Sequence, residues 1–378
     1  MPGLTFIFFH LLFIGFAIFA FGNFYTITYF VLLTVLISAL LNFKQLNFFK
    51  ENIKTDFSWP IVFSVIFVSV VYSLIFAIDG IPIFSDDVNL ARVEQMNMLG
   101  PFGKVFNISI YFIICYSFIA LINGTRKKIL FLFLIVVSLI LLYLTGFRSR
   151  IVDGLFLMIF IYLSYEFSVG FSLKKFLKFF AIFSMPLIAV TGLVIFLTSQ
   201  RLELDAYEAT IEFFRRLFLA NYDVNFSRIS HYVYQYGNEW GYSFVRDINS
   251  VLFGGQSTQE FLTSIFNPKG NSLFVMTMPA FAESYLNFNL YFCSFYALII
   301  FFIRIFIENF IFFLSRLINL DTNVKNSFLL LTSYFLVRFV CSGGISNALV
   351  NFVLPVMIFF IIIFIVSLLF NQTKGRYE

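Results

Sequence analysis

The chain has 378 residues, of which 60% are hydrophobic and only 12% are charged. This composition, with a mean hydropathy of +0.93, excludes a soluble domain and predicts an all-α polytopic membrane protein. The net charge of +5 comes from basic residues dispersed around apolar segments, so it reflects membrane topology and does not predict a nucleic-acid partner.

About twenty apolar residues span a bilayer, and ten segments qualify, some of them short. The predicted spans are residues 4–22, 25–43, 60–78, 105–122, 129–145, 151–166, 179–198, 282–307, 326–341 and 348–370. Residues 1–198 therefore hold seven spans, 199–281 form a long loop, and 282–378 hold three spans and a tail. Residues 301–320 leave room for an additional segment. No basic residue precedes Lys44, so we expect the first apolar stretch to be a span and not a cleavable signal.

The loops between these spans differ in their basic residues. Lysine predominates in the loops at 44–58, 123–128 and 167–178. These loops, the stretch after the eighth span with Arg316 and Lys325, and the tail with Lys374 and Arg376 all fall on one face if there are ten spans. By the positive-inside rule this face is cytoplasmic, together with both termini. Arginine predominates on the outer face, and guanidinium groups suit bidentate binding of phosphate. We therefore expect an outward-facing site for a phosphate-containing substrate.

Three regions of the outer face are candidates for that site. Residues 79–104 contain a predicted short surface helix with Ser85 as its N-cap. Residues 145–150 read Thr-Gly-Phe-Arg-Ser-Arg, which predicts a tight turn between the fifth and sixth spans. The long loop at 199–281 contains a predicted amphipathic helix over 205–220, and a loop of this length is uncommon unless it is functional.

Six arginines on the outer face are candidate ligands for the phosphate groups of a substrate. They are Arg148, Arg150, Arg201, Arg215, Arg216 and Arg338. Arg338 lies well inside the ninth span, where a charge costs about 2.5–3.5 kcal/mol and needs a partner such as a phosphate or Glu283. Structural alternatives stay open, because the arginines of the tight turn can anchor a helix end and those of the loop helix can form a solvated or ion-paired face.

Two residues are candidate general bases, His231 and Glu283. The unperturbed pKa of an imidazole suits proton abstraction, and a carboxylate at the start of the eighth span can act as a base when it is desolvated. The alternatives are a structural role for His231 and, for Glu283, an interface anchor or the ion-pair partner of Arg338. The three Cys and two His residues lack metal-ligand spacing, and there is no nucleotide-binding loop. We therefore expect no metal, no cofactor and a substrate that is itself activated.

Four segments taken together resemble the bacterial O-antigen polymerases, the Wzy-type oligosaccharide repeat unit polymerases. They are Gly80-Ile-Pro-Ile-Phe-Ser-Asp-Asp-Val-Asn-Leu-Ala-Arg92, Thr145-Gly-Phe-Arg-Ser-Arg150, Phe281-Ala-Glu-Ser-Tyr-Leu-Asn-Phe-Asn289, and Leu336-Val-Arg338 followed by Gly343-Gly-Ile-Ser-Asn347. Their order and spacing match the family, as does the long loop before the Ala-Glu-Ser-Tyr segment. The family commonly reads Asn-Phe-Gly where this chain ends in Asn289, so the turn there can differ.

The resemblance implies a GT-C-like glycosyltransferase of the bacterial inner membrane, with its active site at the periplasmic face. Its substrates would be a donor and an acceptor glycan linked to undecaprenyl pyrophosphate, polymerised into O-antigen or a related surface polysaccharide. A chain-length regulator is an expected partner. The arginines would stabilise the pyrophosphate leaving group without a metal, and His231 or Glu283 would deprotonate the acceptor hydroxyl. The Tyr-rich loop with Trp240 would stack on sugar rings.

Three other functions stay open at this point. An O-antigen ligase would use the same chemistry with a different acceptor. A lipid-linked glycan flippase or other transporter predicts charges along a midplane path and short loops on both faces. A membrane acyltransferase predicts a histidine at a lipid-facing site, for which His10 is poorly placed.

Overall fold

The computed structural model describes residues 58–85, 88–145, 148–169, 204–214, 225–253, 255–266, 280–288, 293–318, 320–342 and 348–374, with isolated positions between 174 and 199 and at 278. All regular secondary structure in these ranges is helical, which confirms the predicted fold class at that level. The chain divides into two compact units. The first unit comprises Met1–Leu46, Ser172–Arg304 and Phe335–Val350, and the second comprises Asn47–Phe171, Ile305–Tyr334 and Asn351–Glu378.

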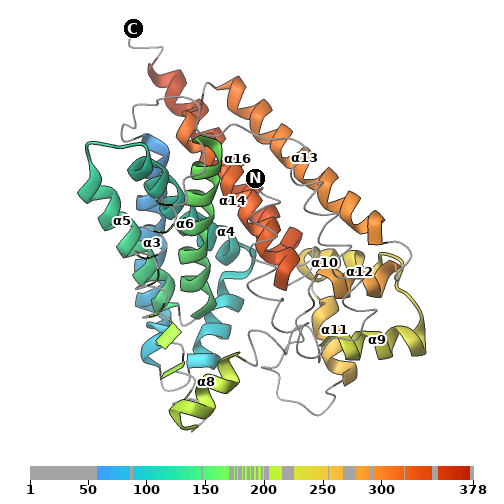
Figure 1. Ribbon diagram of the computed structural model, residues 1–378. Coiled ribbons are helices and arrows are strands. Elements are labelled where there is room, and N and C mark those ends of the chain that lie inside the picture. Colours follow the sequence, from blue (N-terminus) through green and yellow to red (C-terminus); the bar gives the residue numbers. More distant parts are fainter. Residues whose placement is uncertain are drawn as a thin grey trace. The chain divides into compact units, whose positions relative to one another are not determined.

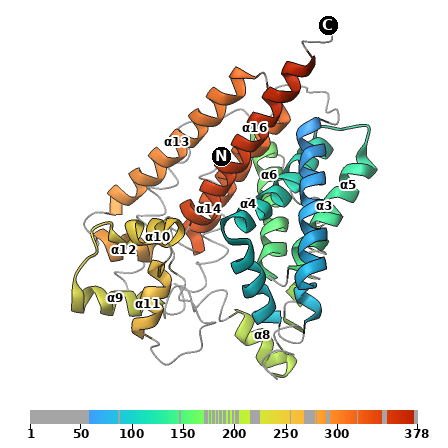
Figure 2. The same ribbon diagram turned by 180° about the vertical axis from the view of Figure 1, so that it is seen from behind.

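The second unit is built around one long helix. Helix α4 (Val88–Ile122) packs against α3 (Trp59–Asp79), α5 (Lys128–Leu144), α6 (Arg148–Val169) and α16 (Leu354–Lys374), as Figures 1 and 2 show. Because it has neighbours on several sides, the apolar part of α4 is mostly buried, whereas α3 buries only a minority of its residues. The second unit is thus a helix bundle with α4 at its centre.

Helix α3 illustrates how the sequence sets the ends and faces of these helices. A proline occupies its first turn, where a backbone N–H has no partner within the helix, so the N–H that proline lacks is not missed. Gly80 follows the last residue of the helix with a φ of +73°. The helix exposes Ile66, Val70, Leu74 and Ile78, which are spaced four residues apart and therefore share one face. A continuous exposed apolar face of this kind is the surface that lipid tails require.

Four described segments are long and apolar enough to cross a membrane, judged by length and composition. They are Trp59–Phe84, Gly103–Ile122, Tyr296–Leu317 and Leu349–Leu369. These segments support a multi-pass membrane protein, and three of them match the predicted third, fourth and tenth spans. The first two predicted spans and nearly all of the seventh lie outside the described residues, so the number of ten spans stays a prediction.

Two predicted boundaries are wrong. The predicted eighth span at 282–307 is divided between α12 (Ala280–Phe288) and α13 (Cys293–Leu317), because polar side chains fasten α12 to neighbouring helices and the apolar run of α13 continues further. The short helix expected from Ser85 and the fourth span form one helix of 35 residues, α4. Ser85 does not cap that helix, since its hydroxyl donates to the carbonyl of Pro82 in the preceding turn (2.7 Å).

Two other local predictions are described in part. Helix α5 ends at Leu144 and α6 begins at Arg148, so the last three residues of the turn predicted at 145–150 are helical, and residues 146 and 147 lie outside the described ranges. Helix α8 (Ala206–Phe214) covers the described part of the helix predicted at 205–220, and the Asp205 carboxylate accepts a hydrogen bond from the amide of Glu208 (2.7 Å).

Polar contacts hold the ends of three helices together at one end of the second unit. The Ser58 hydroxyl donates to Tyr116 (3.0 Å), whose hydroxyl lies 3.5 Å from an Asp321 oxygen, and the Asn123 amide donates to Asn323 (3.4 Å). These bonds join the start of α3, the end of α4 and the start of α14 (Thr322–Ser342). The predicted topology assigns the same three connections to one face of the membrane.

Glycine permits a close approach of three helices in this unit. A Cβ added to Gly154 of α6 would lie 2.9 Å from a methyl of Leu139 in α5, 3.5 Å from one of Ile114 in α4 and 3.5 Å from one of Leu142 in α5. Small residues at helix crossings allow this kind of close packing in membrane proteins.

We predict that Gly154→Leu destabilises the second unit by about 1–3 kcal/mol, because the added side chain overpacks the crossing. Gly154→Ala is the matched control, since a single methyl displaces only the flexible end of Leu139. The measurement is thermal unfolding in detergent, followed by the reaction of the buried Cys115 thiol with a maleimide dye in a background where Cys293 and Cys341 are replaced by Ser. Equal unfolding temperatures for wild type and the leucine variant would contradict this packing.

Candidate functional site

Four short helices of the first unit form a loop module, defined here as α9 (Asn225–Tyr236), α10 (Tyr242–Leu252), α11 (Thr258–Phe266) and α12. Helix α9 packs against α12, and α10 packs against α11 (Figure 1). Three of these helices belong to the loop predicted from the sequence, and the fourth carries the Ala-Glu-Ser-Tyr segment.

The C-terminal turn of α12 is covered by the segment between α9 and α10. Carbonyl groups in the last turn of a helix have no partner within the helix. Here the amide of Glu239 donates to the carbonyl of Leu286 (2.9 Å), and the amide of Trp240 donates to the carbonyl of Asn287 (3.1 Å). The side-chain amide of Asn238 donates to the carbonyl of Tyr285 (2.8 Å). Backbone bonds therefore dock this segment onto α12 whatever side chains surround it.

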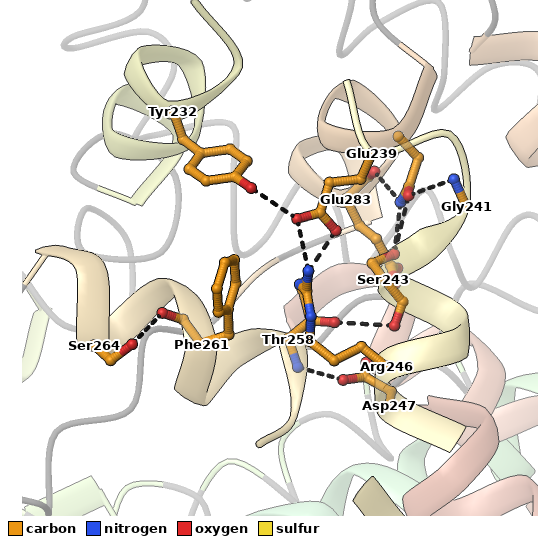
Figure 3. A network of polar contacts seen from close by, with 11 residues as sticks. Tyr232, Glu239, Gly241, Ser243, Arg246, Asp247, Thr258, Phe261, Ser264 and Glu283 are labelled. Atoms are coloured by element: carbon orange, nitrogen blue, oxygen red, sulfur yellow. Dashed lines mark hydrogen bonds and ion pairs between the residues drawn. The ribbon is translucent and has the colours of Figure 1, made fainter. Parts of the chain in front are cut away.

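Asn287 is the centre of a buried polar network, and its partners Gly241, Ser243 and Glu283 are labelled in Figure 3. It is fully buried, its amide nitrogen donates to the hydroxyl of Ser243 (2.8 Å) and the carbonyl of Glu283 (2.9 Å), and its oxygen accepts the amide of Gly241 (2.9 Å). A buried amide of this kind is costly unless its bonds are made, so the bonds of Asn287 fix the position of α10 on α12.

A buried ion pair joins α10 to the segment that precedes it. Arg246 donates two hydrogen bonds to the carboxylate of Glu239, at 3.1 and 3.2 Å, and the two side chains are only 15% and 6% exposed. The hydroxyl of Tyr232 donates to the same carboxylate (3.1 Å), and the Arg246 guanidinium lies 4.0 Å from the centre of the Phe261 ring. Burial, together with the neighbouring Glu239 charge, raises the pKa of Tyr232 to about 12, so this phenol stays protonated and keeps donating at neutral pH.

Glu283 links the module to the next membrane helix. Its side chain is fully buried and accepts a hydrogen bond from the hydroxyl of Tyr296, which is itself fully buried in the first turn of α13. The ring of Phe244 on α10 contacts the ring of Tyr296. Tyr296 also opens the candidate span Tyr296–Leu317, so the module is fixed to the end of a membrane helix.

The structure places the two candidate bases differently. His231 lies on α9 with an exposed side chain, and Tyr234, three residues later, is 89% exposed on the same face of that helix. Glu283 lies on the helix that packs against α9, but it is buried. An incoming hydroxyl group therefore has direct access to His231, whereas Glu283 is positioned by its own protein partners.

The arginines predicted to bind phosphate are described only in part. Arg338 is partly exposed on α14 in the first unit, and Arg150 is partly exposed at the start of α6 in the second unit. Arg148 begins α6, but its side chain lies outside the described residues, as do Arg201, Arg215 and Arg216. Within the described ranges, no group of three His, Cys, Asp or Glu side chains is arranged to hold a metal ion.

Sequence reasoning missed two central residues, Asn287 and Arg246. Arg246 pairs with a carboxylate seven positions earlier, across the turn at Gly241, and the helical rule of pairs four apart does not detect that spacing. Asn287 follows Glu283 by four residues on a short helix that also buries Ser284, and this cluster of buried polar residues is a signal that the segment is not a lipid-facing span.

No family model matches the chain, and no curated protein and no solved structure matches it.

We predict that Arg246→Met opens the loop module without unfolding the membrane helices. Removing one partner of a buried pair costs on the order of 3 kcal/mol, which corresponds to roughly hundredfold faster amide hydrogen exchange in α10. The matched control is Arg228→Met on α9, because Arg228 is partly exposed and forms no hydrogen bond or ion pair with the described residues. Unchanged exchange in the Arg246 variant would show that the pair does not hold the module together.

Proposed function

We propose that the protein is a membrane glycosyltransferase that polymerises oligosaccharide repeat units linked to undecaprenyl pyrophosphate, at the periplasmic face of the inner membrane. The observation that supports this best is the exposed pair of His231 and Tyr234, on a module fastened to the first turn of α13. A lipid-linked glycan presents its sugars just outside the bilayer, and this pair offers a proton acceptor beside an aromatic ring that can stack on a sugar.

The proposed reaction forms one bond and breaks one bond at the donor sugar. The hydroxyl oxygen of the acceptor glycan attacks the anomeric carbon of the donor, and the bond from that carbon to the pyrophosphate oxygen breaks. His231 takes the proton from the hydroxyl, and undecaprenyl pyrophosphate leaves with the electron pair. Negative charge grows on the leaving group, so Arg148, Arg150 and Arg338 are assigned to its stabilisation.

Glu283 is assigned a positioning role in this scheme. Its carboxylate is buried and bound by Tyr296, so it holds α12 against α13 and does not reach a substrate hydroxyl. The remaining outer arginines, Arg201, Arg215 and Arg216, are assigned to the pyrophosphate and lipid end of the substrates. An O-antigen ligase would use the same assignments with a different acceptor.

One observation favours a transporter as the second candidate. Arg304 and Glu308 are buried, at 3% and 5% exposure, within the candidate span Tyr296–Leu317 of α13. They are four residues apart and so lie on one face of the helix. Charged residues inside a membrane span mark substrate or ion pathways by default, which is what a flippase for lipid-linked glycans requires.

A single assay distinguishes the polymerase from the transporter. Purified protein in lipid is given undecaprenyl-pyrophosphate-linked repeat units, without nucleotide and with EDTA. We predict a ladder of lengthened lipid-linked glycans, because the donor already carries its leaving group. Arg338→Ala and Arg148→Ala should abolish the ladder, whereas Arg228→Ala should retain it. Movement of the lipid across vesicles without a ladder would contradict the polymerase and support the transporter.

We also predict that His231→Gln lowers the rate of polymerisation by about 10²–10⁴-fold, the usual contribution of a general base. Glu283→Gln should retain most of the activity, because its amide oxygen can still accept the hydrogen bond of Tyr296. Initial rates of ladder formation provide the comparison. The opposite pattern, with a silent His231 variant and an inactive Glu283 variant, would make Glu283 the base.

A further inference from the structure

Helix α10 has the reverse of the pattern expected for a helix on a water-facing surface. Its buried side carries polar residues, with Ser243 fully buried and Asp247 only 5% exposed. Its outer side is mainly apolar, with Tyr242 58%, Val245 49% and Ile248 46% exposed and the exposed Asn249 beside them. A surface helix in water places its apolar residues inward and its polar residues outward, so this arrangement indicates an apolar environment on the outer side.

The inward-facing polar residues of α10 are satisfied within the module and do not need water. Asp247 accepts the amide of Thr258, the Thr258 hydroxyl donates to the carbonyl of Ser243 (2.9 Å), and Arg246 is paired with Glu239. The inward side of the helix is therefore fixed by hydrogen bonds, and its apolar outward side is a consequence of that register. Phe253, directly after the helix, extends the apolar face and is 82% exposed.

The position of α10 beside a membrane helix identifies what covers this face. Phe244 contacts the ring of Tyr296, and Tyr296 is the first residue of the candidate span Tyr296–Leu317. Trp240, 67% exposed, immediately precedes α10, and Tyr242 opens it. Trp and Tyr prefer the boundary between headgroups and acyl chains, where one part of the ring is in apolar surroundings and its polar atom stays hydrated.

We propose that α10 is an interfacial helix whose outer face, defined as Tyr242, Val245, Ile248 and Phe253, is inserted with Trp240 into the lipid at the boundary crossed by α13. Helices of this kind bury their apolar side about 5–10 Å into the headgroup and acyl boundary. The only basic residue of α10, Arg246, is ion-paired with Glu239 and does not face anionic headgroups. Insertion therefore depends on the apolar face and not on anionic lipid.

Fluorescence of Trp240 in lipid nanodiscs tests this directly, because the chain has only one other tryptophan, Trp59. In the Trp59→Phe variant, lipids brominated near the ester end of the acyl chain should quench Trp240 severalfold more than lipids brominated near the terminal methyl. Aqueous iodide should quench it little. The result should be the same in neutral phosphatidylcholine and in nanodiscs that contain phosphatidylglycerol. If Trp59→Phe does not fold, the difference between wild type and Trp240→Phe gives the same quantity.

Two outcomes would overturn the proposal. Strong quenching by iodide with none by brominated lipid would place the face in water, and protection from both would mean that another protein surface or a second copy covers it. The double variant Val245→Asn and Ile248→Asn provides the positive control, since polar side chains on the outer face should raise the access of iodide to Trp240. The measurement does not depend on catalytic activity, so it stands or fails separately from the glycosyltransferase proposal.

Discussion

The unpaired carbonyl groups at the end of α12 are the constraint on which the loop module depends. A helix that ends inside protein must find donors for its last carbonyls, and α12 finds them in the segment that joins α9 to α10. That segment reaches the carbonyls through turns at Gly237 and Gly241, both at positive φ, and Trp240 between them also has a positive φ. Once the backbone is docked, Asn287 and the Glu239–Arg246 pair determine which face of α10 turns inward.

The two units solve the problem of burying side chains in different ways. The second unit has an interior of packed rings. Phe328 stacks on Phe112 and meets Phe360 edge to face, with ring centres 4.8 Å apart in both pairs. In the loop module, α10 turns the polar Ser243 and Asp247 inward and exposes Tyr242, Val245 and Ile248. An apolar exterior over a polar interior is stable where lipid replaces water, since the polar groups then have only protein partners available.

The sequence predicts the helices of this protein better than it predicts the site. Apolar runs were enough to locate α3, and the same reasoning located the apolar parts of α4 and α16. The prediction of a single span at 282–307 failed because a hydropathy average does not take into account the hydrogen bonds that the polar residues form. Glu283 and Asn287 are polar residues with specific partners, and those partners lie 13 and 44 positions away in the chain. Contacts at that separation leave no periodic pattern to detect.

The proposed reaction takes place in a thin layer, and this explains why the module is built as it is. A donor linked to lipid keeps its pyrophosphate at the headgroup level, so a base on a mobile loop would meet it rarely, while a base held at a fixed height above the membrane meets it each time. Glu283 and Tyr296 tie the module to the end of α13, and the proposed insertion of the apolar face of α10 would add a second attachment at lipid depth. Two attachments remove the rotation that one alone leaves free. With that rotation removed, the exposed face of α9 with His231 keeps one orientation toward the bilayer, which is the arrangement a polymerase needs when both of its substrates are anchored in the same leaflet.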